Sequence, residues 1–384
     1  MKKKSKIIIV LLIILVIGII CVINLFQGTK FKKVTISNNQ SINYSSKMLN
    51  TLYDENTNIL YSDLTINPIL TFFYDLGNDK VKSEMNDYFN DKSTTLINNY
   101  EKIYDRYKEA YKRVNYSNSY WINKGKTISP KATKTAEKLN FPINEREFSK
   151  KSTVNEINNW ITKKSHGKVK GTLKQSEISN AHSVMVGTLY FNEKWQVKYK
   201  KEDINEGTFN GTKGNQKVIY LKSEEDIFLE NSSAKGFMRP YKDEHLYFIG
   251  IIPQEGKDIT DVDIEELMKT RRAEKVDVKI PEFEYEYERE LNDDFQKLGL
   301  KSIYNPGSLN NISKDLYISK IIQKNYIRVD RKGTEAFSYS AVIGKEWAME
   351  ARKNTVYLDQ PFIFMIYDDS IEQVLFIGQV NNIK

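Results

Sequence analysis

A long irregular connection between two apolar segments constrains this chain more than any other feature of its sequence. The flanking segments, within Tyr317–Val380, are rich in Ile, Val, Tyr and Phe, which predicts strands. The connection spans the 28 positions from Gly333 to Pro361, and a compact domain rarely contains such a loop unless it has a function. Its second half holds the large or charged residues Lys345, Glu346, Trp347, Met349 and Arg352. An exposed tryptophan between charged neighbours is typical of a segment that another protein recognises.

The net charge of +8 is concentrated at the N-terminus. Seven lysines lie within the first 33 residues, where there is no acidic residue: Lys2, Lys3, Lys4, Lys6, Lys30, Lys32 and Lys33. The remaining 51 basic and 50 acidic residues nearly cancel. This balance implies no basic face, so a nucleic acid is not an expected partner.

Residues 1–6 form a short basic tail before an apolar run at 7–26. A helix of that length, at ~1.5 Å per residue, spans the thickness of a bilayer core. The competing interpretation is a cleaved signal peptide, but its small-residue site is missing because the first alanine is Ala110. We therefore expect an uncleaved anchor, a linker at 27–42 and a body at 43–384. The body is expected outside the cell membrane, and secretion is the alternative.

The chemistry-bearing residues disfavour an enzyme. Cys21 is the only cysteine, so the body has neither a disulfide nor a thiol nucleophile. The three histidines His166, His182 and His245 include no pair with metal-ligand spacing. No Gly-x-Ser-x-Gly, P-loop or Gly-x-Gly-x-x-Gly motif occurs. We therefore expect no enzymatic activity, no metal and no cofactor.

Helical and strand-like patterns both occur along the body. Apolar spacing of three and four residues at 44–52, 96–111 and 154–161 predicts amphipathic helices. The aromatic stripe of the second helix is expected to be core packing. An apolar run within 182–195 predicts a strand that is buried on both faces. This mixture predicts an α+β fold.

The two ends of the long loop resemble a known family. Lys-Gly-Thr-Glu-Ala at 332–336 opens the loop, and Gln-Pro-Phe-Ile-Phe at 360–364 follows it. With the closing strand Leu375–Val380, this region resembles the reactive-centre region of serpins, and the resemblance covers about Tyr44–Val380 without a gap. It implies an α+β serpin fold with three β-sheets, about eight or nine helices and an exposed reactive-centre loop. A monomer is expected.

The resemblance implies a protease inhibitor that acts as a suicide substrate. A serine protease, or alternatively a cysteine protease, attacks the loop, and the freed segment inserts into the main sheet. The family's spacing places the reactive bond at Trp347–Ala348, with Lys345 and Arg352 as alternative recognition residues. The competing function is a non-inhibitory serpin-like module on the cell surface. The hinge residues by resemblance are Arg331, Gly333, Thr334, Glu335, Ala336, Ser338 and Ser340.

The closure of the main sheet departs from the family pattern. The family usually pairs an Asn on the central strand with a His on the strand that feeds the loop, but the matching residues here are Gly187 and Gln323. Ser62 and Thr65 match the two small hydroxyl residues of a strand-to-helix corner in this region. Because Gly187 has no side chain to pair, we expect a closure that lacks one hydrogen bond, worth about 1 kcal/mol.

The loop departs from the pattern as well. Thr334, Ala336, Ser338 and Ser340 give a small set on one face of an inserted strand. The opposite face contains Phe337 and Tyr339, where inhibitory members usually have small residues. Arg331 stands where an acid is usual.

The apolar run generates a first prediction. Fractionation of expressing cells should place the full-length protein with membranes, its body accessible to external protease, because 7–26 is expected to stay in the bilayer. Recovery of most of the protein from the culture medium, starting after Cys21, would contradict the anchor.

Overall fold

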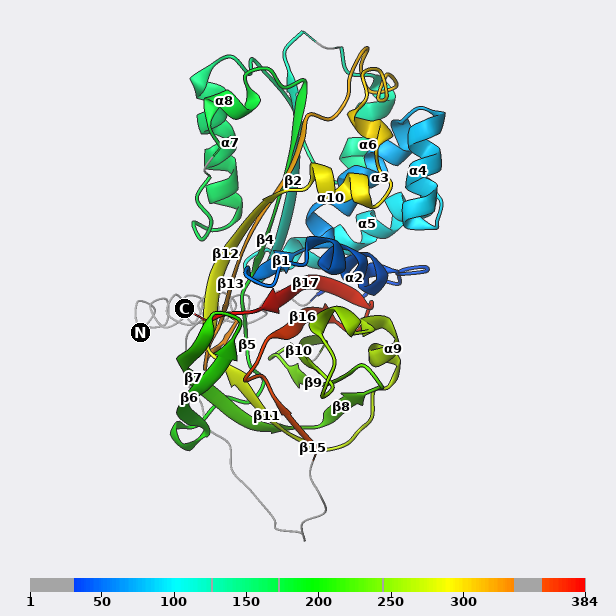
Figure 1. Ribbon diagram of the computed structural model, residues 1–384. Helices are drawn as coiled ribbons and strands as arrows, with labels where there is room; N and C mark the ends of the chain where they lie inside the picture. The colour runs from blue at the N-terminus through cyan, green and yellow to red at the C-terminus, as the bar shows by residue number, and fades with distance from the viewer. Residues whose placement is uncertain (1–30, 126, 172, 244, 335–353, 384) are drawn as a thin grey trace, which may run out of the picture.

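The computed structural model describes residues 31–125, 127–171, 173–243, 245–334 and 354–383. Within these ranges it contains three large β-sheets, a two-stranded ribbon and nine α-helices. Most of the helices cover the main sheet at one end of the molecule, and the other two large sheets pack at the opposite end (Figure 1). This arrangement confirms the predicted α+β architecture.

The main sheet has the spatial strand order β12-β13-β4-β2-β3. The bounds are Phe283–Glu290 (β12), Lys320–Val329 (β13), Ser183–Phe191 (β4), Val114–Asn123 (β2) and Ile143–Arg146 (β3). The central neighbours β13 and β4 run parallel, and each has an antiparallel partner on its other side.

The other two large sheets are built mainly from the later part of the chain. The six-stranded sheet contains β1 (Ile59–Tyr61), β17 (Gln373–Val380), β16 (Phe362–Asp368), β10 (Leu246–Pro253), β9 (Ala234–Pro240) and β8 (Ile227–Glu230). The four-stranded sheet contains β15 (Asn354–Tyr357), β11 (Val276–Pro281), β7 (Gly214–Glu225) and β6 (Ile204–Gly211). Every residue of β16 and β17 is buried, as continuous apolar runs predict. The ribbon joins β14 (Gly333–Thr334) to β5 (Glu193–Lys194).

The helices cover both faces of the main sheet. Their bounds are Ser41–Leu52 (α2), Asn67–Leu76 (α3), Asp79–Phe89 (α4), Ser93–Tyr107 (α5), Pro130–Lys138 (α6), Lys151–Lys164 (α7), Gln175–Ile178 (α8), Ile264–Lys269 (α9) and Asn292–Lys297 (α10). Short 3-10 helices lie at Asp63–Thr65 (η1), Lys108–Ala110 (η2), Lys201–Asp203 (η3), Ile259–Asp261 (η4) and Ser302–Tyr304 (η5). In Figure 1, α7 and α8 lie on one face, and α3 to α6 lie on the other.

The main sheet separates two hydrophobic clusters. On β4, Val184 and Val186 belong to a smaller cluster beneath α7, whereas Met185 and Leu189 belong to the main core. The alternation of β-strand side chains produces this division. The predicted stripe is buried over the length of α5, from Leu96 to Tyr107, and this part is core packing. Its last member, Tyr111, lies beyond the helix and is exposed, which corrects the predicted helix at 96–111.

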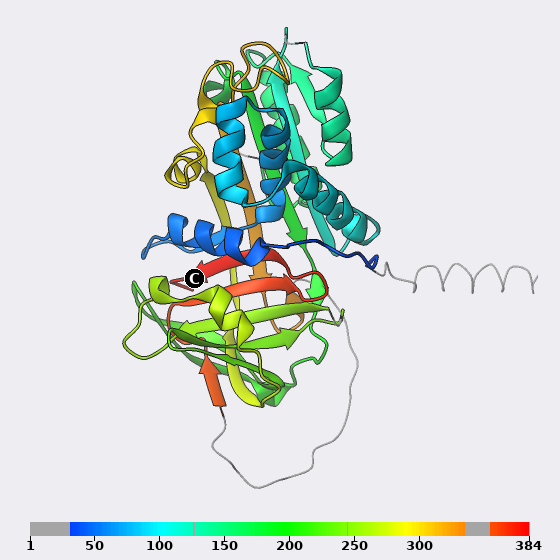
Figure 2. The ribbon, with the colours of Figure 1, turned by 90° about the vertical axis from the view of Figure 1, so that its right-hand side faces the viewer.

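The N-terminal part of the body differs from the predicted division of the chain. Residues 31–40 were expected to be linker, yet they lie along the body between α5 and the turn that joins β16 to β17 (Figure 2). Helix α2 begins at Ser41, inside the predicted linker. The predicted anchor 7–26 lies outside the described residues. Within the described ranges, every helix is too short or too polar to cross a bilayer.

A buried carboxylate connects the first helix to the last strand. Asp63 in η1 accepts hydrogen bonds from Ser41 Oγ at 2.7 Å and from Gln373 Nε2 at 3.2 Å. Burial raises the pKa of Asp63 to about 7, although these hydrogen bonds favour its charged form. Asp63 therefore binds a proton more tightly in the folded protein than in the unfolded chain.

This pKa generates a prediction of pH-dependent stability. The stabilisation from the bound proton is fully present below about pH 4, the ordinary pKa of an aspartate, and is lost as the pH rises through about 7. Melting temperatures measured between pH 4 and 8 should fall across this window in the wild-type protein. Asp63→Asn should flatten the profile, and an unchanged slope in that variant would contradict the assignment.

Candidate functional site: sheet closure and loop hinge

The two central strands of the main sheet are joined along only part of their length. Their ladder pairs Lys320–Gln323 with Val184–Gly187 and ends there. β13 nevertheless continues to Val329, and β4 continues to Phe191. Beyond Gln323 and Gly187, each strand therefore presents an edge toward the other, and such an edge can accept a further strand.

Gln323 closes the last pair of this ladder. Its Nε2 donates to Ser62 O at 2.7 Å and to Thr65 Oγ1 at 2.5 Å, and its Oε1 accepts from Ser62 N at 3.1 Å. Asn325 Nδ2 donates to the same Oε1 at 2.7 Å. The structure thus brings Ser62, Thr65, Gly187 and Gln323 together. The expected loss of one hydrogen bond is not seen. The side chain of Gln323 is long enough to bind Ser62 and Thr65, at the strand-to-helix corner, directly.

Gly187 lies where the sheet touches the corner formed by η1. A Cβ on this residue would be 2.2 Å from Thr65 O and 2.7 Å from Thr65 Cβ. The neighbouring strand supplies an amide instead, because Asn118 of β2 pairs with Gly187. With its nitrogen facing the carbonyls, the Asn118 amide donates to Thr65 O at 2.9 Å. Sequence reasoning missed Asn118 and Asn325, because both strands contain several other polar residues and no local pattern distinguishes these two.

The hinge residues at the opposite end of the two edges are already paired. Gly333 lies opposite Lys194, and Thr334 lies opposite Glu193, in the antiparallel ribbon of β14 and β5. Gly333 has a φ of 145°, and a Cβ there would be 2.2 Å from Glu193 O, so only glycine fits. Thr334 is 2% exposed, and its Oγ1 lies 2.7 Å from the Tyr241 hydroxyl. Thr334 thus faces the main core.

An aromatic cluster supports the hinge from below. The Trp195 ring stacks on Tyr241 at 4.7 Å between centroids, and Trp195 Nε1 donates to Asp330 O at 2.8 Å. The Arg239 guanidinium lies 4.9 Å from the Trp195 ring and forms a buried ion pair with Glu225. The hinge therefore packs against aromatic rings that a buried ion pair holds in place.

Arg331 precedes the hinge and contacts Glu282. Its Nε and NH2 atoms donate to the two carboxylate oxygens at 2.9 and 2.7 Å. Burial favours the neutral acid, but the hydrogen bonds from Arg331 lower the pKa of Glu282 below its ordinary value. Arg331 stands where the family usually has an acid, and Glu282 on the facing segment balances its charge.

The other predicted loop residues lie outside the described ranges. They are Glu335, Ala336, Phe337, Ser338, Tyr339, Ser340, Lys345, Trp347, Ala348 and Arg352.

The close contact at Gly187 generates a prediction about introducing the family's usual Asn–His pair. The double variant Gly187→Asn with Gln323→His should lower the free energy of unfolding by roughly 1–3 kcal/mol, because it overpacks the corner and removes the Gln323 hydrogen bonds. Denaturant titration measures the change. Gly256→Asn is the matched control, since a Cβ there meets nothing within 4 Å and asparagine tolerates its φ of 77°. A higher midpoint for the double variant would show that the corner has room for an Asn–His pair.

Comparisons with known proteins agree with this geometry. A family model described as "Serpin (serine protease inhibitor)" matches residues 39–383. An uncharacterized serpin-like protein of Methanosarcina mazei is 26% identical over 345 residues, which cover 84% of this chain and 81% of that protein. Leukocyte elastase inhibitor A of Rattus norvegicus is 29% identical over 59% of this chain and 65% of its own length.

Solved structures share the fold. The thermophilic serpin tengpin in its native state superposes with a TM-score of 0.81 at 24% identity, covering 92% of this chain and 97% of tengpin. Native protease nexin-1 with heparin superposes with a TM-score of 0.77 at 18% identity, covering 89% of this chain and 98% of its own. The match of the family model over residues 39–383, together with this shared fold, shows that the chain belongs to the serpin family, whose members are generally protease inhibitors and not enzymes.

Proposed function

We propose that this protein inhibits serine proteases as a suicide substrate, trapping them by insertion of the reactive loop between β4 and β13. One observation carries the proposal: the ladder between these strands ends at Gln323 and Gly187, while the first two residues of the loop are paired at the other end of the same gap. The resemblance to leukocyte elastase inhibitors supports the class of target.

The register of the hinge defines where each inserted residue would lie. Thr334 lies opposite Glu193. If the inserted strand kept this antiparallel register, Ala336 would lie opposite Phe191, Ser338 opposite Leu189 and Ser340 opposite Gly187. Phe191 and Leu189 face the main core and are 5% and 1% exposed. The core side therefore has room only for small loop residues, and the loop supplies alanine and serine there.

The large loop residues would lie on the other face of the sheet. The same register places Phe337 opposite Tyr190, whose ring packs on His166 at 4.3 Å between centroids. The register of β13 against β4 brings Tyr326 level with Tyr190. Phe337 would thus join two tyrosines across neighbouring strands, and cross-strand aromatic pairs stabilise sheets. This placement explains how an inhibitory loop tolerates Phe337.

The chemical step belongs to the protease. Its serine attacks the carbonyl of Trp347, the peptide bond to Ala348 breaks, the amine of Ala348 leaves, and an ester joins Trp347 to the protease. Insertion of the fourteen residues from Thr334 to Trp347, at ~3.3 Å each, would move the ester about 46 Å. Distortion of the tethered protease then prevents hydrolysis of the ester. The apolar run at 7–26 supports action at the outer face of the cell membrane, with secretion as the alternative.

Trapping generates a prediction that separates the two faces of the inserted strand. Ser338→Arg should turn the inhibitor into a substrate, because a large charged residue on the core side slows insertion below hydrolysis of the ester. Glu335→Arg, on the other face, is the matched control and should still trap, as should Phe337→Ala. The measurements are a covalent complex that survives denaturing electrophoresis and a raised melting temperature of the cleaved protein.

The same reaction identifies the reactive bond. Proteases with deep apolar specificity pockets should release a C-terminal peptide that begins at Ala348, as determined by mass spectrometry. A peptide that begins at Glu346 or Lys353 would instead assign recognition to Lys345 or Arg352. Clean cleavage by several serine and cysteine proteases, with neither a complex nor added stability, would refute inhibition and favour the non-inhibitory surface module.

A further inference from the structure

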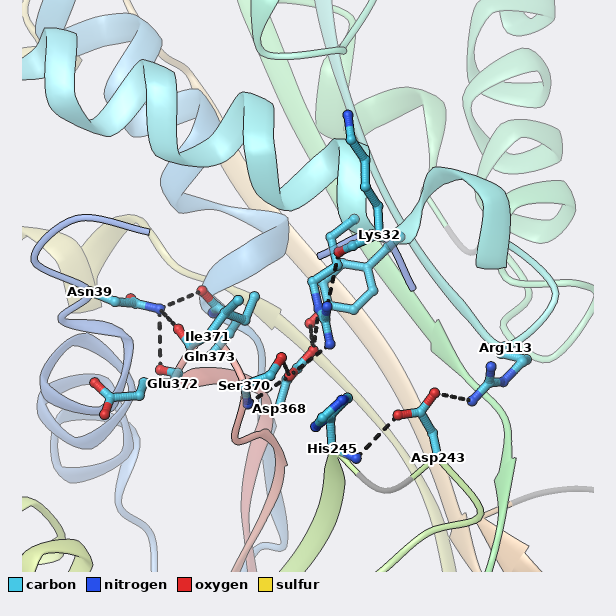
Figure 3. Close-up of polar contacts among 12 residues, drawn as sticks. Lys32, Asn39, Arg113, Asp243, His245, Asp368, Ser370, Ile371, Glu372 and Gln373 are labelled. Atoms are coloured by element: carbon cyan, nitrogen blue, oxygen red, sulfur yellow. Dashed lines mark hydrogen bonds and ion pairs between the residues drawn. The ribbon is translucent and has the colours of Figure 1, made fainter. Parts of the chain in front are cut away.

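Residues 31–39 form an extended strap across the body. The strap pairs with α5 at one end, where Arg106 NH1 donates to Lys32 O at 3.0 Å and Lys32 N donates to Arg106 O at 3.3 Å. At its other end, Asn39 Nδ2 donates to Ile371 O at 2.7 Å and to Glu372 O at 3.2 Å in the β16–β17 turn (Figure 3). The strap thus bridges the two halves of the molecule.

The strap completes a buried ion pair. Arg106 is bidentate to Asp368, with Nε to Oδ2 at 2.6 Å and NH2 to Oδ1 at 3.1 Å, and Tyr107 Oη donates to Oδ2 at 2.8 Å. The side chains of Arg106 and Asp368 are 3% and 0% exposed. The Lys32 carbonyl satisfies the remaining guanidinium nitrogen, NH1. An unsatisfied buried donor is costly, so the strap has a defined seat on the body.

The first residue of the strap contacts a second arginine that leads to the loop hinge. The guanidinium of Arg113 lies 4.6 Å from the centroid of the Phe31 ring. Arg113 also forms an ion pair with Glu193. A second ion pair, at 3.2 Å, joins Arg113 to Asp243 (Figure 3). Glu193 is the residue opposite Thr334 in the hinge ribbon. A continuous series of contacts therefore runs from Phe31 through Arg113 and Glu193 to Thr334.

We propose that the strap is a clamp that controls the loop hinge, so that the N-terminal segment regulates loop insertion; its regulatory meaning rests on the proposed function. Phe31 covers one face of the Arg113 guanidinium and excludes water from its ion pair with Glu193, whose side chain is 7% exposed. Less water around an ion pair strengthens it. Release of the strap exposes Arg113, weakens its hold on Glu193 and loosens the pairing of Thr334.

Through the clamp, forces on the segment before residue 31, or binding to it, would affect the hinge. Any event that draws the strap from its seat, such as tension on residues 1–30 or binding of another molecule to them, acts on the hinge through the same contacts. The hinge lies at the end of the gap that a loop strand would enter. Seating of the strap therefore favours the state with the loop exposed, and release favours movement of the hinge.

Hydrogen exchange of the full-length protein in detergent tests the clamp without a protease. Phe31→Ala removes the ring's contacts with Arg106, Tyr107 and Arg113. Amide exchange in peptides that cover 190–196 and 330–334 should speed up by roughly two- to fivefold, the effect of losing the partly exposed cation–π contact with Arg113. A peptide from β10 should not change. Lys33→Ala is the matched control within the strap, since Lys33 is exposed. Phe31→Tyr should restore slow exchange because it retains the ring.

Several outcomes would overturn the clamp. One is faster exchange in 31–40 with no change in 190–196, which would mean that the strap and the hinge are independent. Another is equal acceleration in all peptides, including β10, which would mean that Phe31 supports only global stability.

Failure of the proposed inhibition can be distinguished from failure of the clamp. If the protein forms no covalent protease complex, but Phe31→Ala still speeds exchange in 190–196 and 330–334, the proposed inhibition is refuted and the clamp is supported.

Discussion

The short parallel contact between β13 and β4 is the constraint on which the rest of this structure depends. It consists of four residue pairs, and it ends at a glycine that must be a glycine because the η1 corner occupies the space of a Cβ. Gln323 binds that corner through both its amide nitrogen and its amide oxygen. The contact between the two strands is therefore specific but short, and most of the length of each strand is not paired with the other.

A strand added between β4 and β13 would contribute much more than the closure it disrupts. Each backbone hydrogen bond contributes about 0.5–1.5 kcal/mol net, and an added strand forms a ladder on both sides. Against this gain stand the four residue pairs and the amide contacts of Gln323, Asn118 and Asn325. In our proposal the state with the loop exposed is metastable, held by local contacts at the corner, at the hinge and at the strap. Such contacts affect the rate at which the sheet opens more than the free-energy difference between the closed and the opened sheet.

Periodicity and turn chemistry predicted the features that depend on local sequence. The doubly buried strand β4 and the helix α5 follow from patterns within a few residues. Gly333 was identified through the resemblance to serpins, and its φ of 145° explains why a glycine is needed there. The closure did not follow from such patterns, because Gln323 and Asn118 act on a corner that is distant in sequence. The strap was missed for the same reason. Its polar, aperiodic sequence is typical of a linker. Its order comes from side chains on α5 that bind its backbone, and from its own Asn39, which donates to backbone carbonyls of the β16–β17 turn.

The crystal structure of the protein cleaved in its loop tests the central claim most directly. The account predicts six strands in the main sheet, with β4 and β13 separated and a new strand between them. Thr334 should remain opposite Glu193, and Ser340 should lie opposite Gly187, with the Phe337 ring between Tyr190 and Tyr326. A cleaved protein that keeps the five-stranded sheet, with Gln323 still bound to Ser62 and Thr65, would contradict it.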